Sequence, residues 1–180
     1  MFKALIKIHS LNGNAATVEI DESNGVGETV TNNITNTNMG STDAANLDPV
    51  ANPVLPDANT YEKWQKFDVT AMGGSSQIDN LKVWRTGALG GAAVHVTNAR
   101  EAAYNGAETY AQPIVTDSTL ATQTMPTSEP SGANLGIGGA LAGALTATGQ
   151  SDYLIHQIQV DATDVAGSTS TMNYQYDETA

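Results

Sequence analysis

Hydrophobic residues alternate with polar ones in several short stretches of the chain, which is the pattern of β-strands with one buried face. The first stretch covers residues 2–8, where every second side chain is apolar. Asn12 and Gly13 form a strong signal for a tight turn, and the alternation resumes over residues 16–21. We therefore expect a β-hairpin over residues 2–21.

Three further strands are expected in the middle of the chain, at residues 60–71, 78–86 and 92–98. The first two carry large hydrophobic residues on both faces, so each is expected to be partly covered on both sides. Phe67 and Val69 lie opposite Trp64 in the first of them, and Leu81 and Val83 lie opposite Ile78 and Trp84 in the second. After the third strand, Asn98 and Glu101 have the spacing of a capping box, which predicts a short helical turn at residues 98–104.

Two more strands are expected near the C-terminus, at residues 153–162 and 170–178. Residues 165–168 (VAGS) suit the turn of a hairpin between them. His156 falls on an apolar face of the first strand, so we expect a core or interface histidine bonded to the backbone.

Residues 116–150 are rich in Thr, Ser, Pro, Gly and Ala, and their second half is low in complexity. This composition is typical of a flexible surface loop, with a short Ala/Leu helix or an inter-subunit contact as alternatives. The glycines have no strand–loop–helix setting and no basic residue beside them, which excludes a nucleotide-binding loop.

Strands near both termini, joined by polar connections, predict an all-β fold over residues 1–180. The expected architecture is a single antiparallel β-sandwich domain, with a jelly roll as one candidate topology. Residues 22–60 are polar, and their three prolines keep them out of helices and sheet interiors. We expect this segment to be a long loop or an extended arm, mobile in the free protein and ordered against a neighbouring molecule.

The composition argues against several functions. The chain carries 19 acidic and seven basic residues, a net charge of −12, so nucleic-acid binding is not expected. The absence of cysteine removes disulfides, thiolate catalysis and cysteine-ligated metals. No stretch approaches the roughly 18 apolar residues of a membrane span, and the first ten residues lack the apolar block of a signal peptide. We therefore expect no membrane association and synthesis in the cytoplasm.

The histidines and serines do not form a recognisable catalytic or metal-binding motif. His9, His95 and His156 lack the spacing of metal ligands, and no serine lies in a nucleophile elbow. We therefore expect no enzyme activity, no metal centre and no cofactor. Glu19, Asp21 and Glu22, at the end of the first expected hairpin, are expected to be solvated.

Two pairs of aspartates offer oxygen ligands for calcium. Asp43 and Asp48 form one pair, and Asp161 and Asp164 form the other. Their spacing matches no EF-hand loop, and aspartates in turns more often cap backbone amides. The sequence therefore leaves two roles open for these aspartates, calcium ligands and caps of turns.

Tyr61, Trp64 and Trp84 are aromatic residues in strands whose faces are ambiguous. A β-sandwich that binds sugars uses exposed rings as stacking platforms, and packing in a core or interface is the alternative. A carbohydrate-binding module is therefore one functional alternative.

Short motifs between Val30 and Gly87 resemble those of small structural proteins of tailed bacteriophages. In chain order they are ITNTN, GSTD, NP, YEKW and IDNLKVWRTG, and the closing NYQYDE also fits, whereas residues 99–150 carry no likeness. The resemblance implies a non-enzymatic virion protein of the capsid surface or neck. A cement or decoration protein on the outer head surface is the first expectation, and a neck or fibre-base protein is the alternative.

On this interpretation the expected partners are the major capsid protein or other virion proteins. A homo-oligomer is also expected, since capsid shells offer three-fold sites that a trimer would match. The residues expected to contact partners are Asn33, Ile34, Asn36, Asn38, Asp43, Tyr61, Trp64 and Trp84.

Overall fold

The computed structural model describes residues 3–10, 16–99, 106–164 and 168–180, and the regular structure in these ranges consists entirely of β-strands. In chain order the strands are β1 (Lys3–Ser10), β2 (Thr17–Asn24), β3 (Thr29–Thr31), β4 (Lys63–Ala71), β5 (Gln77–Thr86), β6 (Val94–Thr97), β7 (Gln123–Thr124), β8 (Ala144–Leu145), β9 (Gly149–Gln150), β10 (Leu154–Gln159) and β11 (Thr169–Thr179). The predicted helical turn at 98–104 lies mostly outside the described residues.

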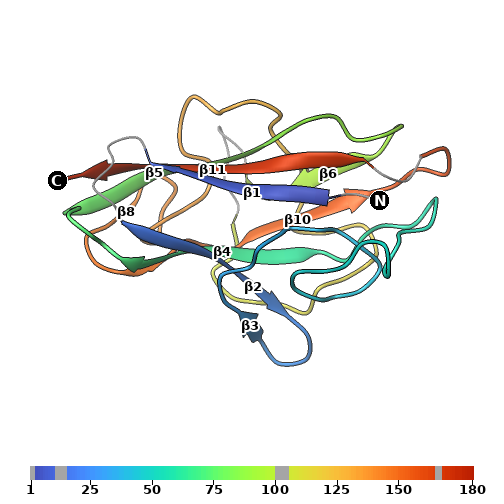
Figure 1. Ribbon diagram of the computed structural model, residues 1–180, viewed down its shortest axis with the longest axis horizontal. Helices are drawn as coiled ribbons and strands as arrows, with labels where there is room; N and C mark the ends of the chain where they lie inside the picture. Colours follow the sequence, from blue (N-terminus) through green and yellow to red (C-terminus); the bar gives the residue numbers. More distant parts are fainter. Residues whose placement is uncertain (1–2, 11–15, 100–105, 165–167) are drawn as a thin grey trace.

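The strands form two sheets that pack face to face in an elongated sandwich (Figure 1). The smaller sheet has the order β1-β11-β5-β8, and the larger has the order β3-β2-β4-β10-β6-β7, with β9 paired to β4. Neighbouring strands run antiparallel, except that β1 and β11 are parallel. The prediction of an all-β sandwich is confirmed, and the finer assignment to a jelly roll stays a prediction.

Both predicted terminal hairpins are wrong, although the strands themselves are present. β1 pairs with β11 in the smaller sheet, whereas β2 pairs with β3 and β4 in the larger one. In the same way β10 joins β4 and β6, while β11 joins β1 and β5. Alternation specifies which face of a strand is buried but not its partner, so consecutive strands can enter opposite sheets.

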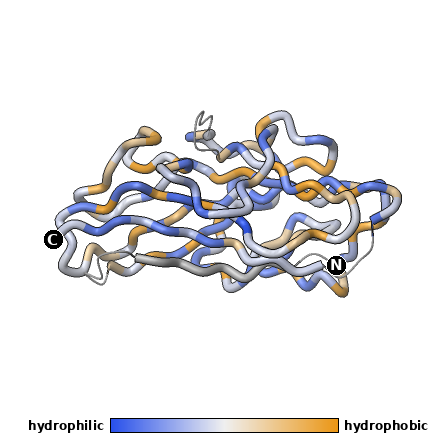
Figure 2. The backbone as a smooth tube through the Cα atoms, turned by 90° about the horizontal axis from the view of Figure 1, so that it is seen from above, coloured by the Kyte–Doolittle hydropathy of each residue, from blue (hydrophilic) through white to orange (hydrophobic). Residues whose placement is uncertain are grey.

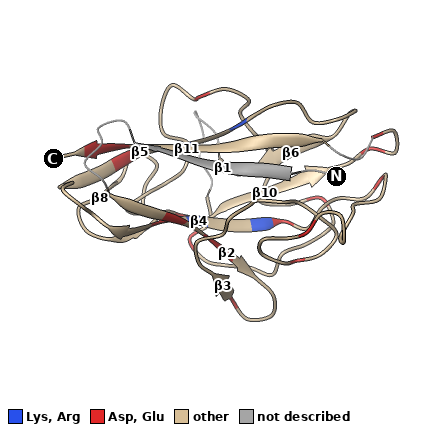
Figure 3. Cartoon of the chain, in the orientation of Figure 1, with Lys and Arg blue, Asp and Glu red and all other residues tan. Residues whose placement is uncertain are grey.

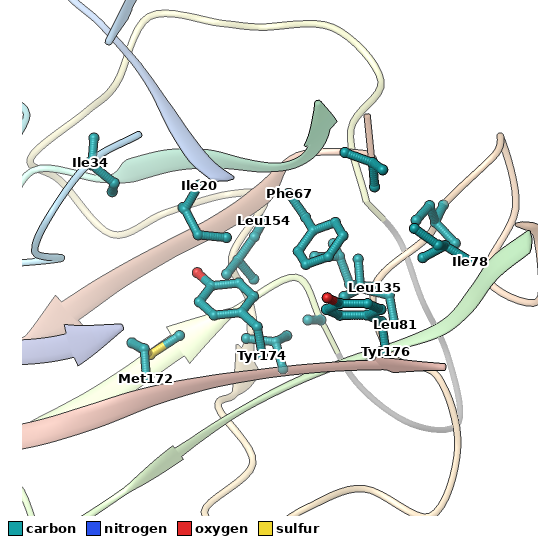
Figure 4. Packing of buried hydrophobic residues seen from close by; sticks show 14 of the residues in the cluster. Ile20, Ile34, Phe67, Ile78, Leu81, Leu135, Leu154, Met172, Tyr174 and Tyr176 are labelled. Atoms are coloured by element: carbon teal, nitrogen blue, oxygen red, sulfur yellow. The ribbon is translucent and has the colours of Figure 1, made fainter. Parts of the chain in front are cut away.

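The main core lies between the two sheets. Ile20, Phe67 and Leu154 project from the larger sheet toward Tyr174 and Tyr176 of the smaller sheet (Figure 4). The Phe67 and Tyr176 rings meet edge to face, with centroids 5.2 Å apart. Hydrophobic positions occur along the whole length of the molecule (Figure 2), so the core follows the long axis of the sandwich.

A β-bulge changes the expected faces of β5. Two residues, Asn80 and Leu81, stand opposite Tyr176 of β11, and Asn80 adopts a left-handed conformation with φ of 51°. The extra residue shifts the alternation by one position, so Ile78 and Leu81 both enter the main core. The prediction that Ile78 faces away from Leu81 is therefore wrong, and strict period-two counting fails at the bulge.

Residues 22–60 do not extend away from the sandwich as an arm. Asp21–Asn24 continue β2, β3 pairs with its end, and the Ile34 amide donates to the Ile20 carbonyl oxygen at 2.8 Å. Ile34 enters the main core, and Met39 and Leu47 are also buried. These three buried side chains anchor the polar segment to the sandwich. Backbone hydrogen bonds to the same domain hold it as well.

Residues 116–150 also supply part of the core rather than a flexible surface loop. Met125, Leu135 and Ile137 are fully buried in the main cluster, and short strands pair this segment with both sheets. The Asn134 side chain accepts from the Val83 amide at 2.7 Å and donates to the Val83 carbonyl oxygen at 2.8 Å. The apolar residues of this segment stand singly among glycines and alanines and show no periodicity. The composition therefore predicted a surface loop where the segment in fact supplies buried core residues.

Gly143→Ala is expected to lower the free energy of unfolding by about 1–3 kcal/mol, since the added methyl group would clash with the Ile137 carbonyl oxygen. Gly132→Ala is the matched control, because an added Cβ there meets nothing within 4 Å. Urea denaturation of both variants tests this, and equal stabilities would mean that residues 137–143 are not packed as described.

Candidate functional site

A chain of buried polar side chains lies between the sheets, beside the hydrophobic core. It begins with an ion pair between Lys63 of β4 and Glu22 of β2, in which Nζ lies 2.7 Å from Oε1. Both side chains are almost inaccessible, at 2% and 1% exposed. Lys63 Nζ also donates to the Ala44 carbonyl oxygen at 2.6 Å, which ties residues 22–60 to β4.

Gln65 is the centre of this network, because both ends of its carboxamide are bonded. Its Nε2 donates to Glu22 Oε2 at 2.9 Å and to Thr37 Oγ1 at 3.4 Å. Its Oε1 lies 3.1 Å from the Tyr174 hydroxyl and 3.1 Å from His156 Nε2. Glu22 and Gln65 are direct cross-strand partners in the β2–β4 ladder, so the strand register creates the contact.

The network ends in a pair of buried histidines whose rings are tilted to one another by 33°. His95 of β6 and His156 of β10 have Nε2 and Nδ1 2.8 Å apart and ring centroids 5.0 Å apart. The prediction that His156 bonds to the backbone is wrong, since its ring nitrogens bond to the side chains of His95 and Gln65. Antiparallel pairing of β6 and β10 joins residues that are 61 positions apart in the chain.

Burial sets the electrostatics of this site. It lowers the pKa of His156 to about 3 and that of His95 well below 6.5, so both rings are neutral at pH 7. Burial also raises the pKa of Glu22, against the opposing effect of the Lys63 ammonium. The pKa of Tyr174 is raised by burial and by the Glu22 charge, so its phenol stays protonated.

Glu19, Asp21 and Glu22 lie in β2, and the prediction that all three are solvated is wrong for Asp21 and Glu22. Asp21 and Glu22 are buried, and only Glu19 is partly exposed. Asp21 accepts from the Asn33 amide at 2.9 Å, and burial raises its pKa. Glu22 shares a strand face with Ile20, and Lys63 shares one with Phe67, so their positions were a sequence signal of burial.

The residues expected to contact partners do not form one surface. Asn33 is exposed; Asn36, Asp43 and Tyr61 are partly exposed; Ile34, Asn38, Trp64 and Trp84 are buried. Asn36 and Asn38 shape their own loop, where Asn36 Oδ1 accepts from the Asn38 amide at 3.1 Å and Asn38 Nδ2 donates to the Leu47 carbonyl oxygen at 2.8 Å. Whether Asn33 or Tyr61 contacts another molecule stays a prediction.

Trp64 packs on the opposite face of the larger sheet from Gln65. Its ring meets Tyr110 and Tyr153 edge to face, with centroids 5.5 and 5.3 Å away, and its Nε1 donates to Glu62 at 3.1 Å. Trp64 is 1% exposed and Trp84 is 8% exposed. Neither indole presents a face on which a sugar could stack, so the structure favours the packing alternative for both.

The four aspartates considered for calcium bind backbone amides. Asp43 accepts from Gly25, and Asp48 accepts from Val50 and Ala51. Asp161 accepts from Thr163, and Asp164 bonds Ala92, Ala93 and Asp161. Within the described ranges, no group of three or more histidine or acidic side chains is arranged to hold a metal ion.

A groove of about 820 Å³ lies at the end of the sandwich where β6 begins and β10 ends. Val94 and Val115 line it as exposed hydrophobic residues, and Asp57, Asp117 and Asp161 supply its carboxylates. No lysine or arginine is among the described residues that line it. Figure 3 shows acidic residues in the loops at this end of the molecule, so the groove is both apolar and negatively charged.

Comparisons with protein-family models, curated proteins and solved structures give no match for this chain. Across the described residues, no helix is long and apolar enough to cross a membrane. The fold and site together define an all-β sandwich with a buried polar network and an acidic, apolar groove at one end.

Proposed function

We propose that the chain is a non-enzymatic structural protein of a bacteriophage virion and acts as a cement protein on the outer surface of the head. The observation that carries this proposal is the place of the phage-like motifs in the fold. YEKW leads into β4 of the larger sheet, whereas IDNLKVWRTG and NYQYDE form the paired strands β5 and β11 of the smaller sheet. The similar residues thus belong to strands of both layers, so the resemblance concerns residues that build the sandwich itself.

The charge of the chain supports an outer position. With 19 acidic and seven basic residues, the protein would repel packaged DNA on the inner side of a shell. On the outer side the same charge opposes no phosphate. An outer cement protein must instead hold capsid subunits through its own surface.

The groove at the β6–β10 end provides such a surface. Its valines and carboxylates are complementary to a capsid segment that carries lysine or arginine beside apolar side chains. We therefore assign the groove to the major capsid protein, with copies of this chain binding at equivalent sites of the shell.

Removal of the protein is expected to make heads rupture at a lower temperature, because a ligand that binds only the assembled shell stabilises it by mass action. Purified wild-type protein added back should restore the rupture temperature. Val94→Asp combined with Val115→Asp should fail to restore it, because the new charges oppose the proposed contact.

Val26→Asp is the matched control, since Val26 is exposed on the β2–β3 turn, outside the lining of the groove. Unchanged rupture with and without the protein would reject the cement role. Restoration by the groove variant would reject the groove as the contact while leaving the cement role in place.

A further inference from the structure

Buried side chains bond both ends of the Gln65 carboxamide, and a hydroxyl group lies beside it. Two hydrogen-bonding groups, the Tyr174 hydroxyl and His156 Nε2, contact Oε1, and the Glu22 carboxylate contacts Nε2. Thr37 Oγ1 lies 3.4 Å from the same nitrogen. All five side chains are buried, so water is kept from the amide.

The histidine pair makes His156 a donor to this carbonyl. Both imidazoles are neutral, and His95 Nδ1 has no hydrogen-bond partner. If His95 Nε2–H donates to His156 Nδ1, then His156 carries its proton on Nε2 and donates to Gln65 Oε1. Two donors on one carbonyl oxygen stabilise the negative charge that develops there when a nucleophile adds.

We propose that Thr37 and Gln65 form an internal ester cross-link with release of ammonia, promoted by Glu22. The inference rests on these contacts alone and is independent of the proposed virion function. Thr37 is the proposed nucleophile because its hydroxyl oxygen accepts from the amide nitrogen and is therefore adjacent to the carbonyl group that it would attack.

The reaction balances within the residues present. The Glu22 carboxylate takes the Thr37 hydroxyl proton as Oγ1 bonds to Gln65 Cδ, and the oxyanion is held by Tyr174 and His156. The Cδ–Nε2 bond then breaks, Glu22 returns the proton to the nitrogen, and ammonia leaves. One ester and one ammonia replace one alcohol and one amide, and Glu22 is regenerated.

Burial gives Glu22 the properties that this role needs. A carboxylate whose pKa is raised accepts a proton more readily than an exposed one. The Lys63 ammonium beside Oε1 keeps the carboxylate positioned, with its other oxygen toward the amide. The product would join the segment between β3 and β4 covalently to β4, in addition to the hydrogen bonds that already hold it.

Intact-mass measurement of the purified, unfolded full chain tests the proposal. The cross-linked chain should be lighter than its sequence by about 17 Da, the mass of ammonia. A mass that equals the sequence would overturn the proposal. Asparagine followed by glycine can lose ammonia too, as at Asn24, so the site of the loss must be mapped.

Trypsin locates the link, because cleavage after Lys63 separates Thr37 from Gln65 in the sequence. An ester between them should keep the peptide that ends at Lys63 joined to residues 64–66, and mild alkali should release the two peptides by hydrolysing the ester. A loss of ammonia without joined peptides would overturn the proposal. Joining through Lys63 Nζ, which would block trypsin at that residue, would also overturn the Thr37 assignment.

Thr37→Val keeps the side-chain shape and removes the nucleophile, so its mass should equal its sequence. Thr35→Val is the matched control on the exposed part of the same loop, and it should keep the loss of about 17 Da. Glu22→Gln should slow or abolish the reaction with Thr37 present. A Thr37→Val chain that still shows the link at Gln65 would reject Thr37 as the nucleophile.

Discussion

Lys63→Met is expected to lower the free energy of unfolding by about 3–5 kcal/mol. The substitution removes the cation but leaves the Glu22 carboxylate in the interior, 1% exposed, without its ionic partner. It also removes the donor to the Ala44 carbonyl oxygen, so residues 22–60 lose a tie to β4. Chemical denaturation at pH 7, followed by tryptophan fluorescence, measures the loss.

Lys82→Met provides the control for this substitution within the same chain. Lys82 pairs with Glu129 at 3.0 Å, but Glu129 is 49% exposed, so water can solvate the carboxylate when the lysine is lost. The expected cost is therefore about 0–1 kcal/mol. Replacing Glu22 and Lys63 together by Met should cost less than Lys63→Met alone, because no buried charge is left. Equal losses for the two single variants would show that the Glu22–Lys63 pair is not buried in solution.

Acidification is expected to destabilise the fold through the His95–His156 pair. The pKa of His156 is about 3 in the folded chain, against 6.5 for an unperturbed histidine, and that of His95 is also lowered. Because the unfolded chain binds these protons first, stability falls as the pH drops below about 6.5 and continues to fall until about 3. Each histidine contributes a slope of about 1.4 kcal/mol per pH unit.

Two buried carboxyl groups change the stability in the opposite direction as the pH falls. A variant without the histidines is therefore needed to separate the two effects. Glu22 and Asp21 have raised pKa values and therefore favour the folded state at low pH. The double variant His95→Leu and His156→Leu keeps both carboxyl groups and removes both histidines. Its free energy of unfolding should depend less steeply on pH between about 6 and 4 than that of the wild type. Parallel curves would mean that the histidines are not buried and neutral.

The sequence predicted most of the strands because alternation of side chains is a local property. Residues 63–71, 94–97 and 154–159 all fall within strands expected from their pattern. Pairing could not be predicted in the same way, as β1 and β2 show, because register and partner depend on contacts between distant residues. The bulge at Asn80 could not be predicted from the sequence either. One extra residue exchanges the two faces of β5 beyond it without any change in composition.

The buried network was missed for a related physical reason. Lys63, Gln65 and His156 are polar residues at core positions, and their burial is tolerated only because each finds partners on another strand. Neither Glu22 nor Tyr174 is near them in the chain. A polar residue on an otherwise hydrophobic strand face indicates that such a partner exists but does not identify it.

The most direct test of the proposed function is the protein composition of purified phage particles, measured by quantitative mass spectrometry. A cement protein that occupies equivalent sites over a shell should be present in about a hundred copies or more per particle. Protease treatment of intact particles should also reach it from outside. If the protein is absent from the particles, the virion assignment is contradicted. A copy number of about a dozen per particle would contradict the cement role and favour a neck or fibre protein.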